Sequence, residues 1–586
     1  MGALKVLCCR GIGMLEDLQI GGGAHVAKAE SLIAVQETPT YFGSSEAPLF
    51  GVVHAPKDGQ VRGGVILCGS LGKDHADNLR GLRVLADLLA ERRILTLRFD
   101  YLGCGDSSYG QLRDNAVAEW QASIGHAVDY LHSAGINDLS AVGVRAGCLI
   151  LHPTLSSLPE SVRRVAYWDP VSTGRRYLRE QTAFFKMSAG EDDVPPGVVS
   201  TIGARFTAAA AAEFSALKLG EFPETLDRFV VGRRASADKQ ISSLADDGRT
   251  ESVFIDGLED CAQPTQLLTQ TSWEAIHFIA GWLDSQVSDA LSTPQLGYAD
   301  SAWIPDEAGK AATFERIERI APHGLFAIRA LPADDGDAVV ERPAVAFFSH
   351  GLAPHQGPNR EWVELSRAVA AAGGTALRWD RRMVGESERA RTGEEIRIYS
   401  PEGIEDALAA ARHARRGASR LQLVGMCSGA WFAAISAMEY GCDSVVLANQ
   451  LQWSRRVKKS LRLAVKPGDN DGQDWEQTPR ARTRRFLQRS LPARAWSALG
   501  LTGAVQAPHL TLGPLARRGC PATVILCPRD LQLFSANRGD VALHRLRRSA
   551  APPQLVVSTG DHAGFHQGVY VPLRSAVLNF IQGEPA

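Results

Sequence analysis

The sequence predicts two tandem α/β domains, each with a mostly parallel β-sheet flanked by helices. Three observations support this prediction. The chain has 586 residues, which is too long for a single hydrophobic core. Short apolar runs alternate with helical patterns, as is typical of parallel sheets that are covered on both faces. In addition, the second half of the chain repeats the first.

The repeat consists of three segment pairs that keep one order and a nearly constant offset of about 280 residues. The pairs are RILTLRFDYLGCGDSS (93–108) with GTALRWDRRMVGESE (374–388), LSAVGVRAGCLIL around Arg145 with LQLVGMCSGAWFA around Cys427, and VILCGSLG near Leu71 with AFFSHGLAP near Leu352. A repeated unit of this length indicates two whole domains and not a solenoid of small repeats.

The repeat predicts a first domain at residues 31–290 and a second domain at residues 305–586. A polar segment with a Thr-Pro break separates them. Residues 1–30 are glycine-rich and aperiodic, so we expect either a disordered arm or a start site placed too early. A basic insertion at residues 453–519 of the second domain is expected to form a helical cap.

The elements of the second half follow from hydrophobic periodicity. The predicted strands are, in order, PAVAFFSH, TALRWD, LQLVGM, SVVLANQ, TVILCP and QLVVSTG. The predicted helices are EWVELSRAVAAAG, GIEDALAAARHARRG, SGAWFAAISAMEYG and VPLRSAVLNFIQG. This alternation of strands and helices predicts a parallel sheet with helices on both faces.

A candidate nucleophile lies in the pentapeptide Gly425-Met426-Cys427-Ser428-Gly429, between the strand LQLV and a helix. This pattern matches the G-x-nucleophile-x-G turn, in which small residues flank a nucleophile at the edge of the sheet. Oriented N–H groups and the helix dipole at that position favour a thiolate. The pentapeptide alone is equally compatible with a buried cysteine in a glycine-rich turn.

Candidate partners follow in the order nucleophile, acid, histidine that this turn requires. Asp530 comes after the strand TVILCP and His562 after QLVVSTG. His562 would deprotonate the thiol, and Asp530 would fix the tautomer of the imidazole. The alternatives are a solvated loop acid and a loop histidine, and His566 is a weaker candidate base. The backbone N–H groups of Ser428 and Leu352 are expected to form an oxyanion hole.

The first domain lacks all three groups at the matching positions. Arg145 replaces the nucleophile and cannot act as one, because its guanidinium stays protonated. Arg233 and Arg234 follow the strand RFVVG, and the final strand ends in Glu259-Asp260-Cys261 with no histidine. We expect a domain without catalysis that builds an interface, lid or substrate channel. Arg145 is either a product of decay or a binding group for a carboxylate or phosphate.

The insertion between SVVLANQ and TVILCP contains far more Lys and Arg than Asp and Glu. Such runs form either a solvated helix face or a docking surface for an acidic acyl or peptidyl carrier protein or a coenzyme A phosphate. The candidate docking residues are Arg455 and Arg456. The aromatic side chains of the insertion either line an acyl pocket or form the core of the cap. They are Trp453, Trp475, Phe486 and Trp496.

Composition and charge exclude several classes of protein. The chain is 45% hydrophobic and 22% charged with a net charge of −2, which argues against nucleic-acid binding. No apolar run reaches the ~18–20 residues of a transmembrane helix, and the start does not resemble a secretory signal. Ten scattered cysteines indicate reduced thiols in a cytoplasmic protein. Cys8 and Cys9 lack partners at zinc-binding spacing, so neither metal nor cofactor is expected.

The second half resembles the α/β-hydrolase superfamily through His350-Gly351, the turn at 378–387, the Cys427 elbow, Asp530 and His562. The first half resembles the hydrolases associated with exosortase systems through RFDYLGCGDS and WDPVSTGRRYL, without their nucleophile. These resemblances imply two tandem α/β-hydrolase-type domains, of which the second carries the helical cap.

Cysteine elbows occur in polyhydroxyalkanoate synthases, in dienelactone hydrolases and in the Dieckmann cyclases that release tetramate or pyridone products from polyketide–peptide assembly lines. The first family has one catalytic domain with a different N-terminal region, and the second is far shorter. The Cys-His-Asp set and the basic cap are most similar to the Dieckmann cyclases.

That resemblance implies that Cys427 takes the acyl chain from a carrier and that His562 helps to remove the α-proton. The carbanion would then attack the thioester and release the ring. A hydrolytic thioesterase or esterase, an intermolecular acyltransferase and a noncatalytic scaffold remain as alternatives.

Overall fold

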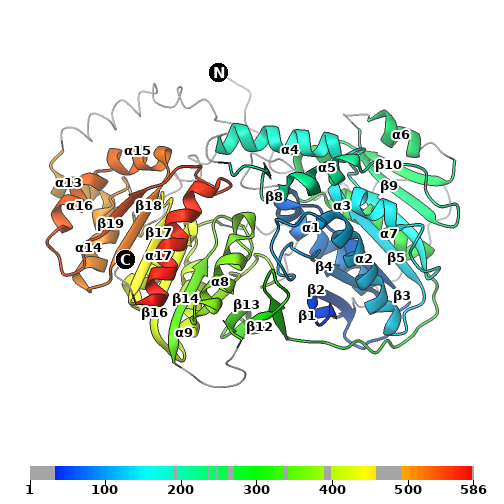
Figure 1. Ribbon diagram of the computed structural model, residues 1–586, viewed down its shortest axis with the longest axis horizontal. Helices are drawn as coiled ribbons and strands as arrows, with labels where there is room; N and C mark the ends of the chain where they lie inside the picture. Colours follow the sequence, from blue (N-terminus) through cyan, green and yellow to red (C-terminus); the bar gives the residue numbers. More distant parts are fainter. Residues whose placement is uncertain are drawn as a thin grey trace, which may run out of the picture.

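The computed structural model describes residues 33–190, 194–234, 238–245, 248–261, 270–333, 341–387, 397–456 and 491–583. Within these ranges the chain forms two α/β units side by side, the first coloured from blue to pale green and the second from green to red (Figure 1). The arm expected at residues 1–30 and most of the basic insertion lie outside the described residues. No described helix is long and apolar enough to cross a membrane.

The first domain contains one large sheet and one small hairpin. The strands of the large sheet are β1 (Val35–Ser44), β2 (Ala47–Pro56), β3 (Gly63–Cys68), β4 (Ile94–Phe99), β5 (Leu139–Val144), β6 (Val162–Trp168), β9 (Asp227–Arg233) and β10 (Thr250–Ile255). Their order is β1-β2-β4-β3-β5-β6-β9-β10. β2 pairs antiparallel with β1 and β4, and the remaining neighbours are parallel. The hairpin consists of β7 (Val198–Thr201) and β8 (Ala204–Thr207).

The second domain repeats this topology with one additional strand at the edge. Its strands are β11 (Ser301–Pro305), β12 (Ala311–Ile320), β13 (Leu325–Pro332), β14 (Arg342–Phe348), β15 (Thr375–Trp379), β16 (Ala418–Met426), β17 (Ser444–Ala448), β18 (Ala522–Leu526) and β19 (Gln554–Val557). Their order is β11-β12-β13-β15-β14-β16-β17-β18-β19. The strands from β15 to β19 pair in parallel, and the first three are antiparallel.

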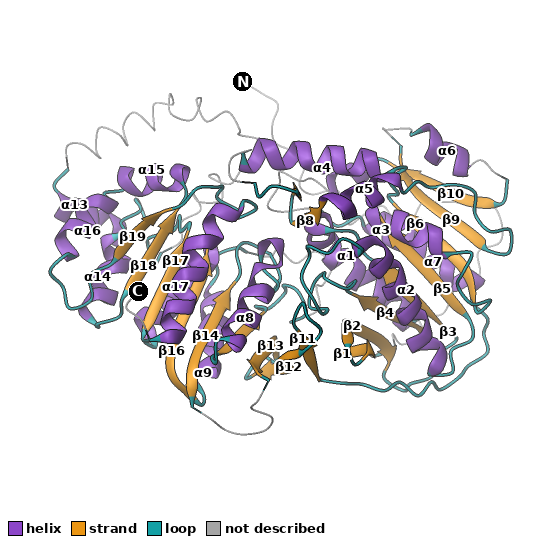
Figure 2. Ribbon diagram, in the orientation of Figure 1, coloured by secondary structure: helices purple, strands orange, loops and turns teal. Residues whose placement is uncertain are grey.

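Helices cover both faces of each sheet (Figure 2). In the first domain they are α1 (Gly72–Glu91), α2 (Ala116–Ser133), α3 (Ala146–Leu151), α4 (Gly174–Ala189), α5 (Ala208–Ala216), α6 (Lys239–Ala245) and α7 (Trp273–Gln286). In the second they are α8 (Glu361–Ala371), α9 (Pro401–Arg415), α10 (Ser428–Glu439), α13 (Ala493–Leu501), α14 (His509–Arg517), α15 (Pro528–Ala536), α16 (Gly539–Leu546) and α17 (Tyr570–Gln582). Each sheet has an apolar cluster on either face, which is why its central strands are apolar along their length.

The prediction of two tandem α/β domains with mostly parallel sheets is confirmed. The antiparallel strands at the start of each sheet were not predicted, because they have polar positions between their apolar ones and no β-α unit around them. The described part of the predicted cap, α13 and α14, is helical.

The two domains contact one another through equivalent turns that follow β4 and β15. Arg98 donates to both carboxylate oxygens of Glu386 at 2.9 and 2.7 Å, and Arg378 donates to one carboxylate oxygen of Asp106. All four side chains are buried. Arg98 matches Arg378 in the repeat, and Asp106 matches Glu386. The exchange is therefore reciprocal, as in the isologous interface of a two-fold dimer.

A histidine links the two turns. The ring nitrogens of His355 lie 2.7 Å from an oxygen of Asp106 in the first domain and 2.7 Å from an oxygen of Asp380 in the second. Burial by itself would lower the pKa of His355, but the two carboxylates raise it to about 10. The matching His75 does not lie between two carboxylates in this way. Burial together with Arg98 lowers its pKa to about 4. The two histidines therefore occupy equivalent positions at the interface, but only the pKa of His355 is raised.

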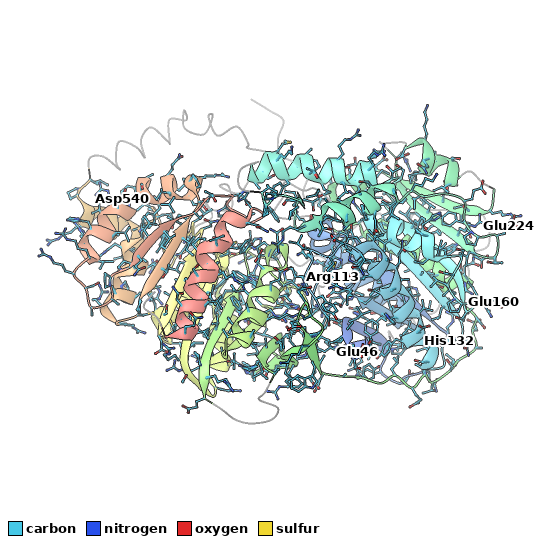
Figure 3. All side chains as sticks on the ribbon, in the orientation of Figure 1. Glu46, Arg113, His132, Glu160, Glu224 and Asp540 are labelled. Carbon is cyan, nitrogen blue, oxygen red and sulfur yellow. The ribbon has the colours of Figure 1, made fainter. Side chains whose placement is uncertain are left out.

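Further contacts extend the interface around this centre. The rings of Phe50 and Phe326 have centroids 6.1 Å apart, so the two sheets share a small apolar cluster. Arg360 donates to two backbone carbonyls of the turn after β4, at 2.5 and 2.6 Å. Arg113, labelled in Figure 3, lies where the domains meet and pairs with Glu307 at 3.3 Å.

The His355 cluster predicts a pH-dependent stability. Because its pKa is near 10 in the folded chain and 6.5 ordinarily, its contribution is complete below pH 6.5 and is lost as the pH rises through 10. We expect His355→Gln to lower the free energy of unfolding by about 3 kcal/mol at low pH and by much less at high pH. Urea unfolding measures this, with Arg163→Gln at an exposed position as the control. An equal loss at both pH values would contradict the assignment.

Candidate active site

The candidate nucleophile lies on a strained turn between β16 and α10. Cys427 has φ 52° and ψ −113°, a conformation that costs free energy for any residue with a side chain. A side chain on Gly425 or Gly429 would collide with backbone atoms of Gly429 or Phe348, so both positions require glycine. The N–H of Cys427 donates to the carbonyl of Ala448 on the neighbouring strand at 2.9 Å. The turn therefore holds the sulfur at the carboxyl end of the sheet.

Cys427, His562 and Asp530 come together at this edge. His562 Nε2 lies 3.2 Å from Cys427 Sγ, and His562 Nδ1 lies 2.6 Å from Asp530 Oδ2. Asp530 stands in the first turn of α15, directly after β18, and His562 stands in the loop after β19. The order of the parallel strands β16, β17, β18 and β19 places these three chain segments next to one another.

The electrostatics of the site favour a charged pair. Burial alone would lower the pKa of His562, but the Cys427 sulfur and the Asp530 carboxylate raise it well above its usual value. The cysteine and the aspartate are 9% and 2% exposed, so little water competes with these interactions. The arrangement therefore favours a protonated His562 ring in contact with the Cys427 sulfur.

The loop expected to form the oxyanion hole is tied to the elbow. The N–H of Gly351 donates to Ser428 Oγ at 2.7 Å, which places Leu352 close to the start of α10. Among the described residues, neither the Ser428 N–H nor the Leu352 N–H has a protein acceptor. His350 in the same loop is buried, and burial together with His562 and Lys73 lowers its pKa to about 4. The loop thus contributes a neutral imidazole near the candidate base.

One residue that organises the site was not among those predicted. Asn449, which is fully buried, follows β17 with φ 49°. Its Nδ2 donates to the carbonyls of Asp561 and His562 at 2.9 and 3.0 Å, and its Oδ1 accepts the N–H of Cys527 at 2.9 Å. Asn449 therefore fastens the loop of His562 to the loop of Asp530. Its only sequence signal is an amide directly after a buried strand.

His566, the weaker candidate base, does not reach the cysteine. Its Nδ1 accepts the N–H of Gly568 at 3.0 Å, and its ring stacks on Phe185 of the first domain. His562 is the histidine that contacts Cys427.

The equivalent position in the first domain contains a buried ion cluster. Arg145 has φ 51° and ψ −115°, almost the backbone conformation of Cys427. Its guanidinium lies 2.9 Å from Asp74 and 3.1 Å from Asp169, and Asp169 also pairs with Arg233 at 2.7 Å. Arg145 is 4% exposed. Since both sides of its guanidinium already face carboxylates, the geometry favours a structural role over binding of a carboxylate or phosphate.

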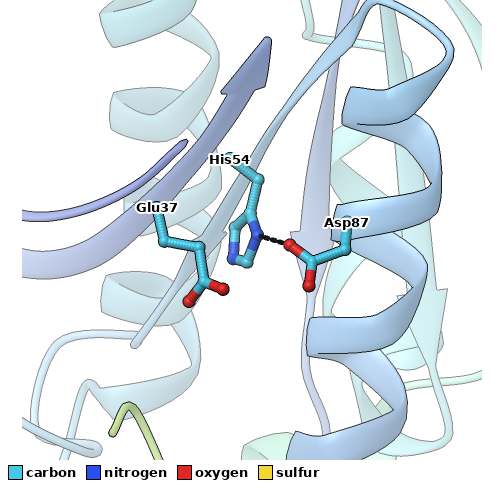
Figure 4. A group of neighbouring side chains, drawn as sticks. All are labelled: Glu37, His54 and Asp87. Atoms are coloured by element: carbon cyan, nitrogen blue, oxygen red, sulfur yellow. Dashed lines mark hydrogen bonds and ion pairs between the residues drawn. The ribbon is translucent and has the colours of Figure 1, made fainter. Parts of the chain in front are cut away.

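One cluster of possible metal ligands occurs in the described ranges: Glu37, His54 and Asp87 (Figure 4). His54 Nδ1 lies 2.8 Å from Asp87, and His54 Nε2 accepts from Arg98 Nε at 2.9 Å. Glu37 pairs with Arg83 at 2.7 Å. Burial and Arg98 lower the pKa of His54. Both ring nitrogens already have partners, so the cluster serves as a support for Arg98 at the interface.

The predicted binding residues of the cap lie in two different environments. Trp453 and Trp496 are each 2% exposed; Trp453 packs on Phe534, and Trp496 Nε1 donates to the carbonyl of Gln506. They contribute to the packed interior, which favours the core alternative over an acyl pocket. Arg455 and Arg456 are exposed. Trp475 and Phe486 lie outside the described residues.

Comparisons with known proteins give the following result. No protein-family model matches the chain, and no curated protein is significantly similar to it. Among solved structures, a thermostable esterase from Pseudomonas putida is 17% identical over 46% of this chain and 80% of its own, with a TM-score of 0.28. An esterase from Pyrococcus furiosus is 15% identical over 47% of this chain and 91% of its own, with a TM-score of 0.29. Likenesses this weak carry no argument about activity.

Proposed function

We propose that the second domain is an acyl-transfer enzyme that works through a thioester on Cys427. The observation that carries this proposal is the contact of the Cys427 sulfur with His562, at 3.2 Å, in a relay completed by Asp530 at 2.6 Å. The relay supplies a nucleophile, a proton carrier and an orienting carboxylate on one sheet edge.

The first half-reaction follows from this pair. The Cys427 thiolate attacks the carbonyl of a thioester substrate, and the N–H groups of Ser428 and Leu352 stabilise the oxyanion. When the intermediate collapses, the bond to the leaving sulfur breaks and His562 donates its proton to that thiolate. The products are an acyl-Cys427 thioester, a free thiol and a neutral His562.

Within this class we propose a Dieckmann cyclase that releases a polyketide–peptide chain as a tetramate or pyridone ring. Neutral His562 removes the α-proton of the bound acyl chain, and the carbanion attacks the Cys427 thioester carbonyl. A carbon–carbon bond forms, the carbon–sulfur bond breaks, and the electron pair returns to sulfur. The site is left with the same thiolate and imidazolium with which it started.

Two features favour transfer to carbon over hydrolysis. A thioester is more electrophilic toward carbon nucleophiles than an oxyester, so cysteine suits a condensation better than an esterase. The low exposure of Cys427 and Asp530 also limits the access of water to the acyl-enzyme. A hydrolytic thioesterase uses the same first half-reaction and differs only in the group that attacks second.

We further propose that an acidic acyl or peptidyl carrier protein delivers the substrate. Arg455 and Arg456 are exposed on the second domain, and Arg455 also pairs with Glu439. Of the two, Arg456 is therefore the stronger candidate for long-range attraction that raises the rate of encounter.

The reaction class is tested with β-ketoacyl-aminoacyl N-acetylcysteamine thioesters. We expect a cyclic product and, after rapid quenching, an acyl adduct on Cys427 in the intact-mass spectrum. Cys427→Ala should abolish both, and Cys427→Ser should lower kcat/KM by at least about a hundredfold. Free acid as the sole product would replace the cyclase with a hydrolase, and turnover by Cys427→Ala would contradict the nucleophile.

The charged pair is tested through alkylation of Cys427 by iodoacetamide. Because the pKa of His562 is raised by the sulfur and the aspartate, the wild-type rate should change little between about pH 6 and pH 8. In His562→Ala the rate should rise about tenfold per pH unit, as for an ordinary thiol. Parallel pH profiles in both proteins would show that no such pair exists.

The positioning role of Asn449 gives a third expectation. Asn449→Ala should lower kcat by roughly ten- to a hundredfold with a smaller change in KM, because it misplaces the histidine and not the substrate. Asn537→Ala is a matched control, since Asn537 is also buried but donates to Leu533 within α15. An equal effect of both substitutions would point to a general loss of stability.

A further inference from the structure

A cavity of about 250 Å³ lies between the two domains, and we refer to it as the interdomain chamber. One wall is the loop at residues 350–360 of the second domain. The second domain also contributes residues 383–386 and Phe565. The remaining lining comes from the first domain, chiefly the start of α1 and the hairpin strand β8. Neither Cys427 nor His562 lines the chamber. The chamber is connected to the candidate active site through chain segments that belong to both.

Two of those segments belong to both the chamber and the candidate active site. Leu352, the expected oxyanion donor, lines the chamber, and Gly351 before it is bound to Ser428 at the elbow. Phe565, three residues after His562, also lines it, and its carbonyl accepts from Asn359 Nδ2 at 2.7 Å. An acyl carbonyl held by Leu352 would therefore have its chain directed toward the chamber.

The first domain closes this space with its own insertion between β6 and β9. Arg205 on β8 pairs with Glu364 on α8 at 3.0 Å. Phe185 on α4 stacks on His566, with ring centroids 6.4 Å apart and planes 16° apart. The long helix α4 extends from the first domain toward the second in Figure 1. The insertion thus occupies, across the interface, the place of a lid on the second domain.

The lining of the chamber is apolar with paired charges. Its apolar side chains come mainly from the first domain, among them Leu71, Leu79, Trp120 and Phe206. Lys73 pairs with Asp77 at 2.6 Å, and Arg205 pairs with Glu364. Arg83 and Arg98, which also line the chamber, pair with Glu37 and Glu386, and Arg360 donates to two backbone carbonyls. Because most of these cations already have acceptors, the lining favours an uncharged chain over a phosphate or carboxylate.

We propose that the first domain supplies half of the binding chamber for the acyl chain that is transferred to Cys427. This inference rests on the proposed function and adds the substrate class: an uncharged, largely apolar acyl group. The domain that lost its own nucleophile is thus retained as the specificity wall of its neighbour.

The test makes the chamber smaller by placing larger side chains at first-domain positions that line it. Ala204→Trp on β8 and Leu79→Trp on α1 both place a large ring in the lining, and Ala209→Trp at an exposed position of the same insertion is the matched control. We expect the first two variants to lower the rate constant for acylation of Cys427 by a decanoyl thioester at least about tenfold, measured as release of the thiol, with acylation by an acetyl thioester nearly unchanged. Alkylation of Cys427 by iodoacetamide should stay at the wild-type rate in all three.

A loss that is equal for acetyl and decanoyl substrates, or no loss in either chamber variant, would overturn the proposal. Binding of Nile red, measured by fluorescence, separates this result from failure of the proposed function. If no thioester acylates the wild-type protein, acyl transfer is wrong. Weaker dye binding in the chamber variants than in Ala209→Trp would still support the chamber, and equal binding in all three would refute it.

Discussion

The buried cluster of Asp106, Arg378 and His355 fixes the two domains relative to one another. Asp106 belongs to the first domain, and its carboxylate is paired by Arg378 and His355 of the second. Arg378 and His355 also pair with Glu315 and Asp380 of their own domain, so it is Asp106 whose charge depends on the docking of the second domain. A buried charge that loses its partner is costly, and the cluster therefore permits one docking geometry. His355 also lies in the loop at residues 350–360. This loop carries Leu352 and forms one wall of the interdomain chamber. This electrostatic contact therefore links the docking of the domains to the position of the Leu352 loop and to the wall of the chamber.

Both domains have the same strained backbone conformation at one turn, but the side chain on that turn differs between them. Cys427 and Arg145 have nearly identical left-handed conformations, each on the turn after a central strand. The register of the next strand places Asn449 beside Cys427 and Asp169 beside Arg145. In the second domain this neighbour is an amide that holds the loop of His562. In the first domain it is a carboxylate that pairs with the Arg145 guanidinium.

Much of the architecture could be predicted from the sequence because its signals are local. The apolar runs predicted the parallel strands, and the glycines around Cys427 predicted the elbow. Asp530 and His562 were found because the elbow requires an acid and then a histidine, each after a later strand, and these two residues follow the predicted strands TVILCP and QLVVSTG. The order of β18 and β19 in the sheet brings them to the same edge. Asn449, the His355 cluster and the lid formed by the first domain depend on contacts between distant segments, which leave no periodic pattern. The tryptophans of the cap were ambiguous, since aromatic side chains serve a core and a pocket equally well.

The proposed chemistry requires a protonated His562 ring between the Cys427 sulfur and the Asp530 carboxylate. Nitrogen NMR of the His562 ring at neutral pH tests this protonation, with Cys427→Ser as the reference. We expect an imidazolium in the wild-type protein and a neutral imidazole in the variant, because the sulfur and Asp530 together raise the pKa of His562. A neutral ring in both proteins would contradict it.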